Sequence, residues 1–342
     1  MKLNTNFSSH QEMVGAQESH ALRINDSSQA MIIDSLINLY SDPIGSIVRE
    51  LTSNAIDSHR ERDLKRAGQI PLSMEEDLEW FDDRLSVEVA LVDSNPLIGI
   101  DANITFSDFG MGLSPQRVKD IYTVLGTSTK RDDNHQIGGF GLGCKSPWAY
   151  TDSFYVNTRF NGTEYYYLMH KGETVPSMDL VFTQATDKKN GTSVIVPLKT
   201  GEKSHEIVKF ANAINEQLVF FKNVSYVGDF ANYRSIRKPD IVEETEHFVI
   251  TTNIAQDSSY PKLLVGNVLY PLDSSMLDNP ALLPSMITKV GIGEIDLVPS
   301  REAVRYTPRT IAAIEAKLEL IKQDAVTTVE NALNNVTDLK DF

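Results

Sequence analysis

The sequence predicts an α/β protein in which a mixed sheet is covered on one face by helices and a second α/β domain follows. Two observations carry this prediction. Segments with the apolar spacing of amphipathic helices alternate with segments of alternating, β-branched residues, as in layered α/β folds. The chain of 342 residues is also long enough for two domains with separate cores. We expect an N-terminal arm over 1–25, a first domain over 26–228 and a second domain over 229–342.

Composition limits the classes of function. The chain is 41% hydrophobic and 23% charged, which is ordinary for a soluble globular protein. Its N-terminal stretch lacks the apolar core of a signal peptide, and no apolar run approaches the ~20 residues that span a bilayer. The single cysteine excludes an internal disulfide and favours the cytoplasm. A formal net charge of −15 argues against nucleic acid as a partner, while association with a membrane surface stays open.

The first helix is expected over Ser41–Arg62. Asp42 is a good N-cap, and Pro43 is favoured in the first helical turn. An apolar stripe follows at helical spacing, formed by Ile44, Ile47, Val48, Leu51 and Ala55. Beside the stripe, polar side chains share one arc of the helix, namely Glu50, Asn54, Asp57 and Glu61. Taken alone, this arc fits either a solvated face or a functional site, although asparagine is a poor choice for a merely exposed helix position.

A strand that ends in an acidic residue comes next. Ala102–Phe109 reads as a strand with Asp108 near its end, and Gly110 and Gly112 follow in a turn. A helix is then expected after Ser114, which is a good N-cap. The same pattern fits an ordinary strand–turn–helix connection.

A glycine-rich run occupies Ile137–Tyr150. Four glycines fall within six positions there, namely Gly138, Gly139, Gly141 and Gly143. Cys144 stands where a P-loop needs lysine, and the spacing also fails the dinucleotide fingerprint. A glycine-rich loop that opens a short helix is nevertheless a natural anion cradle, because its free N–H groups and helix dipole point at the ligand. A flexible turn is the alternative.

The remaining elements complete the two domains. A strand at Ser153–Phe160, a turn at Asn190–Gly191 followed by a strand from Thr192, and an amphipathic helix at Ser204–Phe221 finish the first domain. In the second domain, Lys262–Leu272 and Gly293–Pro299 read as strands, and a long helix starts at the N-cap Thr307 with Pro308 in its first turn. The acidic stretch Ser73–Arg84 is expected to be a surface insertion.

Together these motifs resemble those of a known family. The order is E-x-x-x-N-x-x-D on a helix, D-x-G-x-G after a strand, a glycine-rich lid, and G-T before a strand. This order resembles the Bergerat-fold (GHKL) ATPases, which include gyrase B, the ninety-kilodalton heat-shock chaperones, sensor histidine kinases and MutL. The stretch "VPSREAV" at Val298–Val304 resembles the phosphate-sensing loop of the chaperone branch. The lid and this loop are most similar to those of the A-cistron rapid-lysis proteins of T-even bacteriophages, which are longer, so truncation of the second domain stays open.

The resemblance implies a role for each motif residue. Glu50 would be the general base, Asn54 would bind Mg²⁺, and Asp57 would complete the same helix face. Asp108 would accept a hydrogen bond from the adenine amino group, and Thr192 would support that edge. The glycines would allow close approach of backbone, with Gly110 and Gly112 in the adenine pocket and Gly139, Gly141 and Gly143 in the lid. Lys145 would either touch phosphate or be a solvated charge, and Arg301 would sense the γ-phosphate and stabilise transition-state charge.

The function implied is slow, Mg²⁺-dependent hydrolysis of ATP to ADP and phosphate. The ATP cycle would drive domain closure and an ATP-dependent homodimer, with residues 1–25 as the exchanged arm and a protein target that the sequence does not name. By resemblance, the biological role would be control of phage lysis or evasion of a host exclusion system. The alternative is a non-catalytic, ATP-gated protein-binding switch. A DNA-acting clamp is a third candidate, against which the acidic charge argues.

Overall fold

The computed structural model describes residues 35, 39–94, 101–124, 143–172, 176–199, 203–228, 236, 238–254, 261–277 and 286–335. The predicted N-terminal arm over 1–25 and the lid glycines Gly139 and Gly141 lie outside these described residues.

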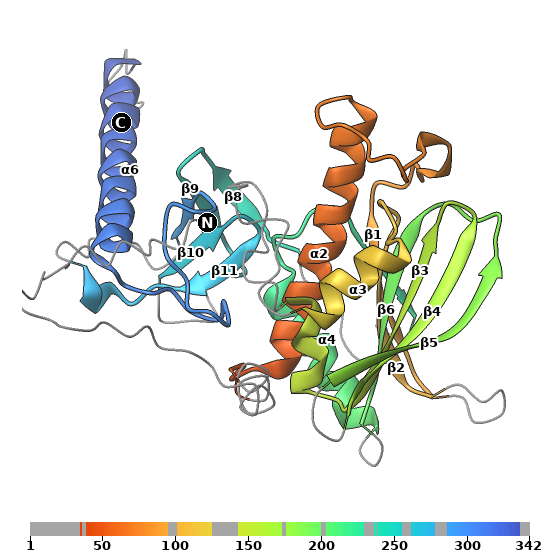
Figure 1. The fold of residues 1–342 in the computed structure, drawn as a ribbon. Coiled ribbons are helices and arrows are strands. Elements are labelled where there is room, and N and C mark those ends of the chain that lie inside the picture. The colour runs from red at the N-terminus through yellow and green to blue at the C-terminus, as the bar shows by residue number, and fades with distance from the viewer. Residues whose placement is uncertain are drawn as a thin grey trace, which may run out of the picture.

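Seven strands form the first sheet, in the spatial order β5-β4-β3-β6-β2-β1-β7 (Figure 1). They are β1 (Val87–Val92), β2 (Asn103–Asp108), β3 (Ser153–Phe160), β4 (Thr163–Lys171), β5 (Pro176–Ala185), β6 (Gly191–Pro197) and β7 (Val224–Gly228). Neighbouring strands are antiparallel except β1 and β7, which run parallel. The sheet is therefore mixed, as the sequence predicts.

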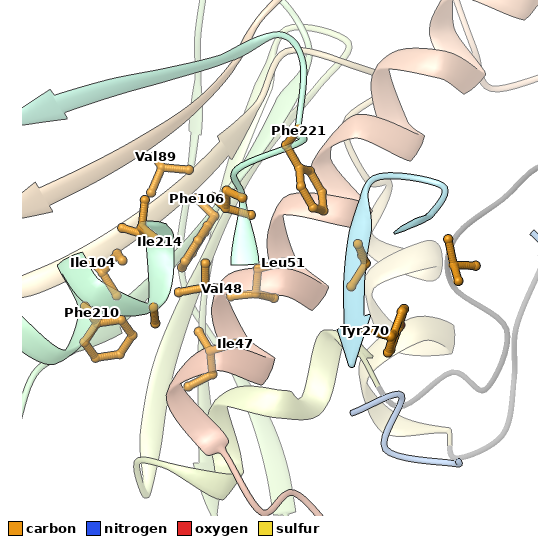
Figure 2. Close-up of a cluster of buried hydrophobic side chains, with 14 of the residues drawn as sticks. Ile47, Val48, Leu51, Val89, Ile104, Phe106, Phe210, Ile214, Phe221 and Tyr270 are labelled. Carbon is orange, nitrogen blue, oxygen red and sulfur yellow. The ribbon is translucent and has the colours of Figure 1, made fainter. Parts of the chain in front are cut away.

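Helices cover one face of this sheet. They are α2 (Pro43–Arg66), α3 (Pro115–Thr123), α4 (Lys203–Gln217) and the short 3₁₀ helix η4 (Gly143–Ala149) (Figure 1). Figure 2 shows apolar side chains of α2, such as Ile47 and Leu51, in one buried cluster with Phe106 of β2 and Ile214 of α4. Burial of this apolar surface joins the two layers and establishes the α/β class.

A second sheet begins after β7. Its spatial order is β11-β10-β12-β9-β8, with β8 (Ile241–Glu244), β9 (Phe248–Thr251), β10 (Lys262–Val265), β11 (Val268–Pro271) and β12 (Met286–Val290). The long helix α6 (Pro308–Asn335) packs against β12 and buries Ile314, Leu318 and Ile321. The change from one sheet to the other falls between β7 and β8, and buried residues of both sheets belong to one apolar cluster. The predicted division into domains at 228/229 stays a prediction.

Local capping sets the starts of the long helices. The Asp42 carboxylate accepts a hydrogen bond from the Gly45 amide at 3.0 Å, and Pro43 opens α2. At α6, the Thr307 hydroxyl accepts a hydrogen bond from the Thr310 amide at 3.3 Å, and Pro308 is the first helical residue. Both predicted helix starts are confirmed. The helix α4 ends at Gln217, four residues before the predicted end at Phe221.

One predicted strand is wrong. Gly293–Pro299 contains a turn and a single bridge between Leu297 and Val304 rather than a strand. The Glu294 carboxylate accepts a hydrogen bond from the Gly291 amide at 2.8 Å, which closes a tight turn at the start of this segment. The side chain of Ile295 is buried, so the apolar pattern that suggested a strand reflects burial without sheet pairing.

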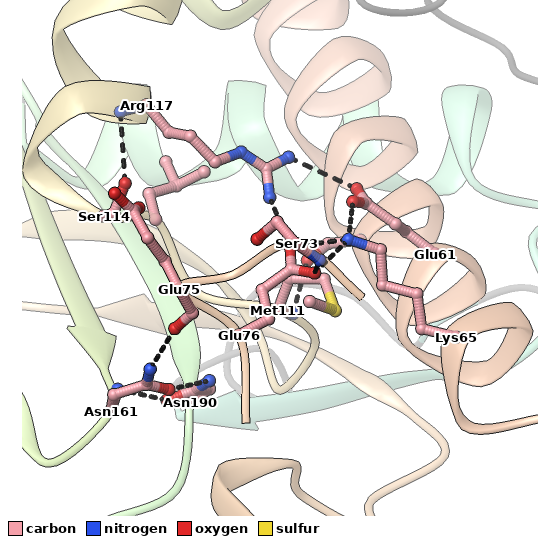
Figure 3. Close-up of polar contacts among 12 residues, drawn as sticks. Glu61, Lys65, Ser73, Glu75, Glu76, Met111, Ser114, Arg117, Asn161 and Asn190 are labelled. Carbon is pink, nitrogen blue, oxygen red and sulfur yellow. Dashed lines mark hydrogen bonds and ion pairs between the residues drawn. The ribbon is translucent and has the colours of Figure 1, made fainter. Parts of the chain in front are cut away.

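The acidic stretch Ser73–Arg84 is only partly a surface insertion. The Glu76 side chain is 5% exposed and forms ion pairs with Lys65 of α2 and Arg117 of α3 (Figure 3). The ring of Phe81 is also buried. The stretch therefore ties the C-terminal half of α2 to α3, which the prediction of an exposed loop missed. Among the described residues, no helix is both long and apolar enough to cross a membrane.

Candidate functional site

The helix α2 buries an unusual number of polar side chains. Its buried polar residues are Ser46, Arg49, Glu50, Thr52, Ser53, Asp57, His59 and Arg62. Buried charges cost free energy unless they are paired or serve a site, so a helix of this composition is a candidate for function rather than for packing alone. The reading of the arc as a solvated face is wrong for Glu50 and Asp57, which are each 4% exposed.

Glu50 lies between two guanidinium groups. Arg49 donates from Nε to Glu50 Oε1 at 3.3 Å, and Arg301 Nη1 lies 3.8 Å from Glu50 Oε2. A Cβ added at Gly143 would lie only 2.5 Å from Glu50 Oε2, so the backbone at the start of η4 lies directly against the carboxylate. A side chain at position 143 would displace the Glu50 carboxylate from its present place. Elements from three parts of the chain meet at this one carboxylate.

Arg301 lies in a strained loop that faces α2. Its φ of 56° is in the left-handed region, which non-glycine residues adopt rarely and at some cost. The Arg301 amide donates to the carbonyl of Val298 at 2.8 Å, and the bridge between Leu297 and Val304 closes the loop. Nη1 of Arg301 is buried and has no hydrogen-bond partner in the described structure. Buried donors normally make a hydrogen bond, and the Glu50 carboxylate at 3.8 Å is too far to accept one, so this nitrogen keeps its capacity to donate to a second anion.

Asp108 is the last residue of β2. It contacts α2 at Ser58, which is about two helical turns after Glu50. Its Oδ1 accepts hydrogen bonds from the Ser58 hydroxyl at 3.0 Å and from the Gly110 amide at 2.9 Å. Burial raises the pKa of Asp108 to about 6, and the hydrogen bonds from Gly110, Ser58 and the Thr192 amide limit the rise. A carboxylate held this way is a fixed acceptor for an amino group of a ligand.

The turn after Asp108 is pressed against neighbouring backbone. A Cβ at Gly110 would lie 2.6 Å from the backbone carbonyl of Ser58, and one at Gly112 would lie 2.1 Å from the carbonyl oxygen of Arg159. Gly112 also has a φ of 66°, which favours glycine. Both glycines are therefore required where the chain passes between α2 and β3.

Thr192 faces Asp108 from the neighbouring strand. The two residues are partners in the register of β2 and β6. The Thr192 hydroxyl lies 3.2 Å from the Thr158 hydroxyl, and both side chains are buried. The two residues that the sequence predicts to contact adenine therefore lie on adjacent strands, while the contact itself stays a prediction.

Asn54 and Asp57 lie between the two carboxylates along α2. Asn54 is half-buried one turn after Glu50, and Asp57 is buried one turn further. In the part of the chain that the structure describes, no group of three or more His, Cys, Asp or Glu side chains could hold a metal alone. A single amide oxygen suits Mg²⁺ that is otherwise held by phosphate and water, so the residues present fit a nucleotide-bound Mg²⁺.

Lys145 is not a solvated charge. The side chain is buried, and Nζ donates to the carbonyl oxygen of Ile121 at 2.6 Å. The Cys144 thiol is half-buried and lies 3.6 Å from the same carbonyl. Of the two alternatives for Lys145, the exposed one is excluded, and contact with phosphate stays a prediction.

Several residues of the site were missed from the sequence. His59 accepts a hydrogen bond from the Phe109 amide at 2.7 Å, and Arg62 donates to the Phe109 carbonyl at 2.7 Å. Both hold the turn after Asp108 on α2. Glu302 accepts hydrogen bonds from Ser41 and Asp42 at the start of α2. His59 and Arg62 continue the spacing of the apolar stripe through Leu51 and Ala55, so polar residues at buried positions of the helix were the available signal. Nothing local indicates the partner of Glu302.

Comparison with models of known protein families and with curated proteins finds no match to this chain.

Proposed function

We propose that the chain is a slow, Mg²⁺-dependent ATPase of the Bergerat-fold class, in which the second domain completes the site. The observation that carries the proposal is the position of Glu50, buried between Arg49 and Arg301 and against the backbone of Gly143. A carboxylate placed where three separate segments converge suits chemistry on a group that arrives between them. We propose ATP as the ligand because the order of the sequence motifs resembles that of the Bergerat-fold ATPases.

Asp108 supports adenine as the base. Its carboxylate can accept a hydrogen bond from the amino group of adenine. Guanine has an oxygen acceptor at the equivalent ring position, which the carboxylate would repel. The hydrogen bonds from Ser58 and Gly110 fix the carboxylate in place, so little ordering is needed when a base binds. A charge-assisted hydrogen bond of this kind contributes roughly 1.5–3 kcal/mol to binding.

Glu50 would act as the general base. One oxygen of the carboxylate takes a proton from water while the water oxygen attacks the γ-phosphorus, and the bond from that phosphorus to the bridging oxygen of ADP breaks. Phosphate leaves and the proton on Glu50 passes to solvent. Arg301 Nη1, which makes no hydrogen bond, would bind the charge that grows on the transferred group. Mg²⁺ held by Asn54 would supply positive charge to the phosphates.

The deciding experiment compares Glu50→Ala with wild type. The variant is expected to bind ATP normally and to lose about 10²–10⁴-fold in kcat, because the carboxylate acts on water rather than on the bound nucleotide. Asp108→Asn is the complementary variant and is expected to lose ATP binding in calorimetry. Wild-type rates of phosphate release from Glu50→Ala would reject this assignment of the base.

The alternative function is a non-catalytic switch that closes on ATP. One observation favours it: both oxygens of Glu50 lie near arginines, whose positive charge favours the ionised carboxylate and so weakens it as a base. Steady-state phosphate release measured beside nucleotide affinity separates the two functions. Tight binding without turnover would select the switch. In either case we propose ATP-dependent closure and dimerisation, with lysis control in a phage-infected cytoplasm as the role that the resemblance supports.

A further inference from the structure

Tyr270 carries a second orphaned donor close to the same site. It lies on β11, is 2% exposed, and its hydroxyl has no hydrogen-bond partner among the described residues. Leaving a buried hydroxyl unsatisfied costs free energy, and native structures contain few such groups. An apolar ring would fill this position in the buried cluster equally well (Figure 2). The hydroxyl therefore needs an explanation other than packing.

The Tyr270 ring belongs to the same buried cluster as Ile47 and Leu51, which lie within one turn of Glu50 on α2 (Figure 2). Burial raises the pKa of Tyr270, and the charges of Arg301, Arg49 and Glu50 also act on it. Arg301 Nη1 is another buried donor without a hydrogen-bond partner, and it lies 3.8 Å from Glu50 Oε2. Two buried donors without a hydrogen-bond partner, the Tyr270 hydroxyl and Arg301 Nη1, thus come from different segments beyond β7.

We propose that Tyr270 is a ligand-contacting residue that donates its hydroxyl, together with Arg301, to the terminal phosphate of ATP. This inference rests on the proposed function and extends it, because the second sheet itself would then touch the nucleotide. The phenol is neutral and donates one hydrogen bond, whereas Arg301 adds charge. Occupancy by the γ-phosphate would satisfy both donors, and its departure would leave both orphaned again. ADP would therefore hold the two domains less firmly than ATP.

Tyr270→Phe removes one oxygen and leaves the ring. If the hydroxyl serves the phosphate, the variant without nucleotide is expected to melt at the wild-type temperature or above it, because an unsatisfied group has been removed. A non-hydrolysable ATP analogue is expected to raise the melting temperature of the wild type more than ADP does. In Tyr270→Phe this difference between the two nucleotides should be smaller. Its kcat should fall by roughly 10²-fold, as for other single donors to a developing charge.

Tyr306→Phe is the matched control. The Tyr306 hydroxyl accepts a hydrogen bond from the Asp273 amide at 2.7 Å, so its removal is expected to lower the melting temperature and to leave the difference between analogue and ADP unchanged. A Tyr270→Phe protein with the wild-type kcat and the wild-type response to the analogue would overturn the inference while leaving the proposed function intact. Failure of the wild-type protein to bind ATP would overturn both.

Discussion

The Glu302 carboxylate binds the start of α2, accepting a hydrogen bond from the Asp42 amide at 2.8 Å. It also accepts from the amide and hydroxyl of Ser41, each at 3.0 Å, and from the Ser46 hydroxyl at 3.1 Å. An anion at a helix N-terminus satisfies free N–H groups and opposes the helix dipole. Here the anion comes from the Arg301 loop, so the loop and α2 are joined directly.

Glu302→Ala is expected to loosen this junction. The variant should lose about 1–2 kcal/mol of unfolding free energy in denaturant titrations, because part of the group is exposed and solvent screens the rest. Hydrogen exchange should accelerate at the amides of Ser41 and Asp42. Glu319→Gln, which removes only an exposed pair with Lys322, is the control and should change neither quantity. Unchanged exchange at Ser41 and Asp42 in Glu302→Ala would count against the junction.

The same junction should weaken in acid. Burial acts to raise the pKa of Glu302, but the hydrogen bonds from Asp42 and Ser41 outweigh it and the pKa is lowered. A carboxyl with a lowered folded-state pKa contributes stability above its unfolded pKa and loses it as the pH falls through the folded value. The stability difference between wild type and Glu302→Ala should therefore be full at neutral pH and vanish in strong acid. A difference independent of pH would contradict this.

ATP affinity should depend on the protonation of Asp108. Its pKa of about 6 in the free protein means that the acceptor is ionised at neutral pH and protonated below that value. Binding of an amino donor needs the ionised form, so affinity should be constant above about pH 7 and fall by up to about tenfold per pH unit below about pH 6. Adenosine, which has no phosphate to titrate, is the control ligand in calorimetry. An affinity for adenosine that stays constant down to pH 5 would exclude Asp108 as the acceptor.

Sequence patterns predicted the elements whose ends depend on neighbouring residues. The cap at Asp42, the cap at Thr307 and the strand ending at Asp108 each depend on residues within a few positions, and each is confirmed. The partner of Glu302 lies 260 residues away, so no local pattern could indicate it. Lys145 was left open for the same reason, since its partner is the backbone carbonyl of Ile121. The orphaned hydroxyl of Tyr270 is visible only once the two sheets are placed.

Gly143→Ala should damage turnover through Glu50. The added methyl group would lie 2.5 Å from Glu50 Oε2, which forces the carboxylate or the backbone of η4 to move. We expect retained ATP binding and a loss of kcat approaching that of Glu50→Ala. A double-mutant cycle is the check: in the Glu50→Ala background, Gly143→Ala should cost nothing further. Additive losses in kcat would show that the methyl group acts elsewhere.

Arg301→Ala should separate nucleotide binding from closure. Asp108, which we propose as the adenine contact, lies on the first sheet, and its hydrogen bonds come from Ser58 and Gly110 rather than Arg301. Affinity for ATP is therefore expected to stay near that of wild type. Compaction by a non-hydrolysable ATP analogue should disappear, because the buried guanidinium beside Glu50 is the charge that the γ-phosphate would bind.

Small-angle scattering combined with light scattering measures both compaction and dimerisation. Arg305→Ala is the matched control, since that side chain is exposed in the same segment. Wild type should be compact and dimeric with the analogue and looser with ADP, and Arg305→Ala should behave likewise. Normal compaction of Arg301→Ala would reject its role as sensor, and identical wild-type profiles with analogue and ADP would reject the closure itself.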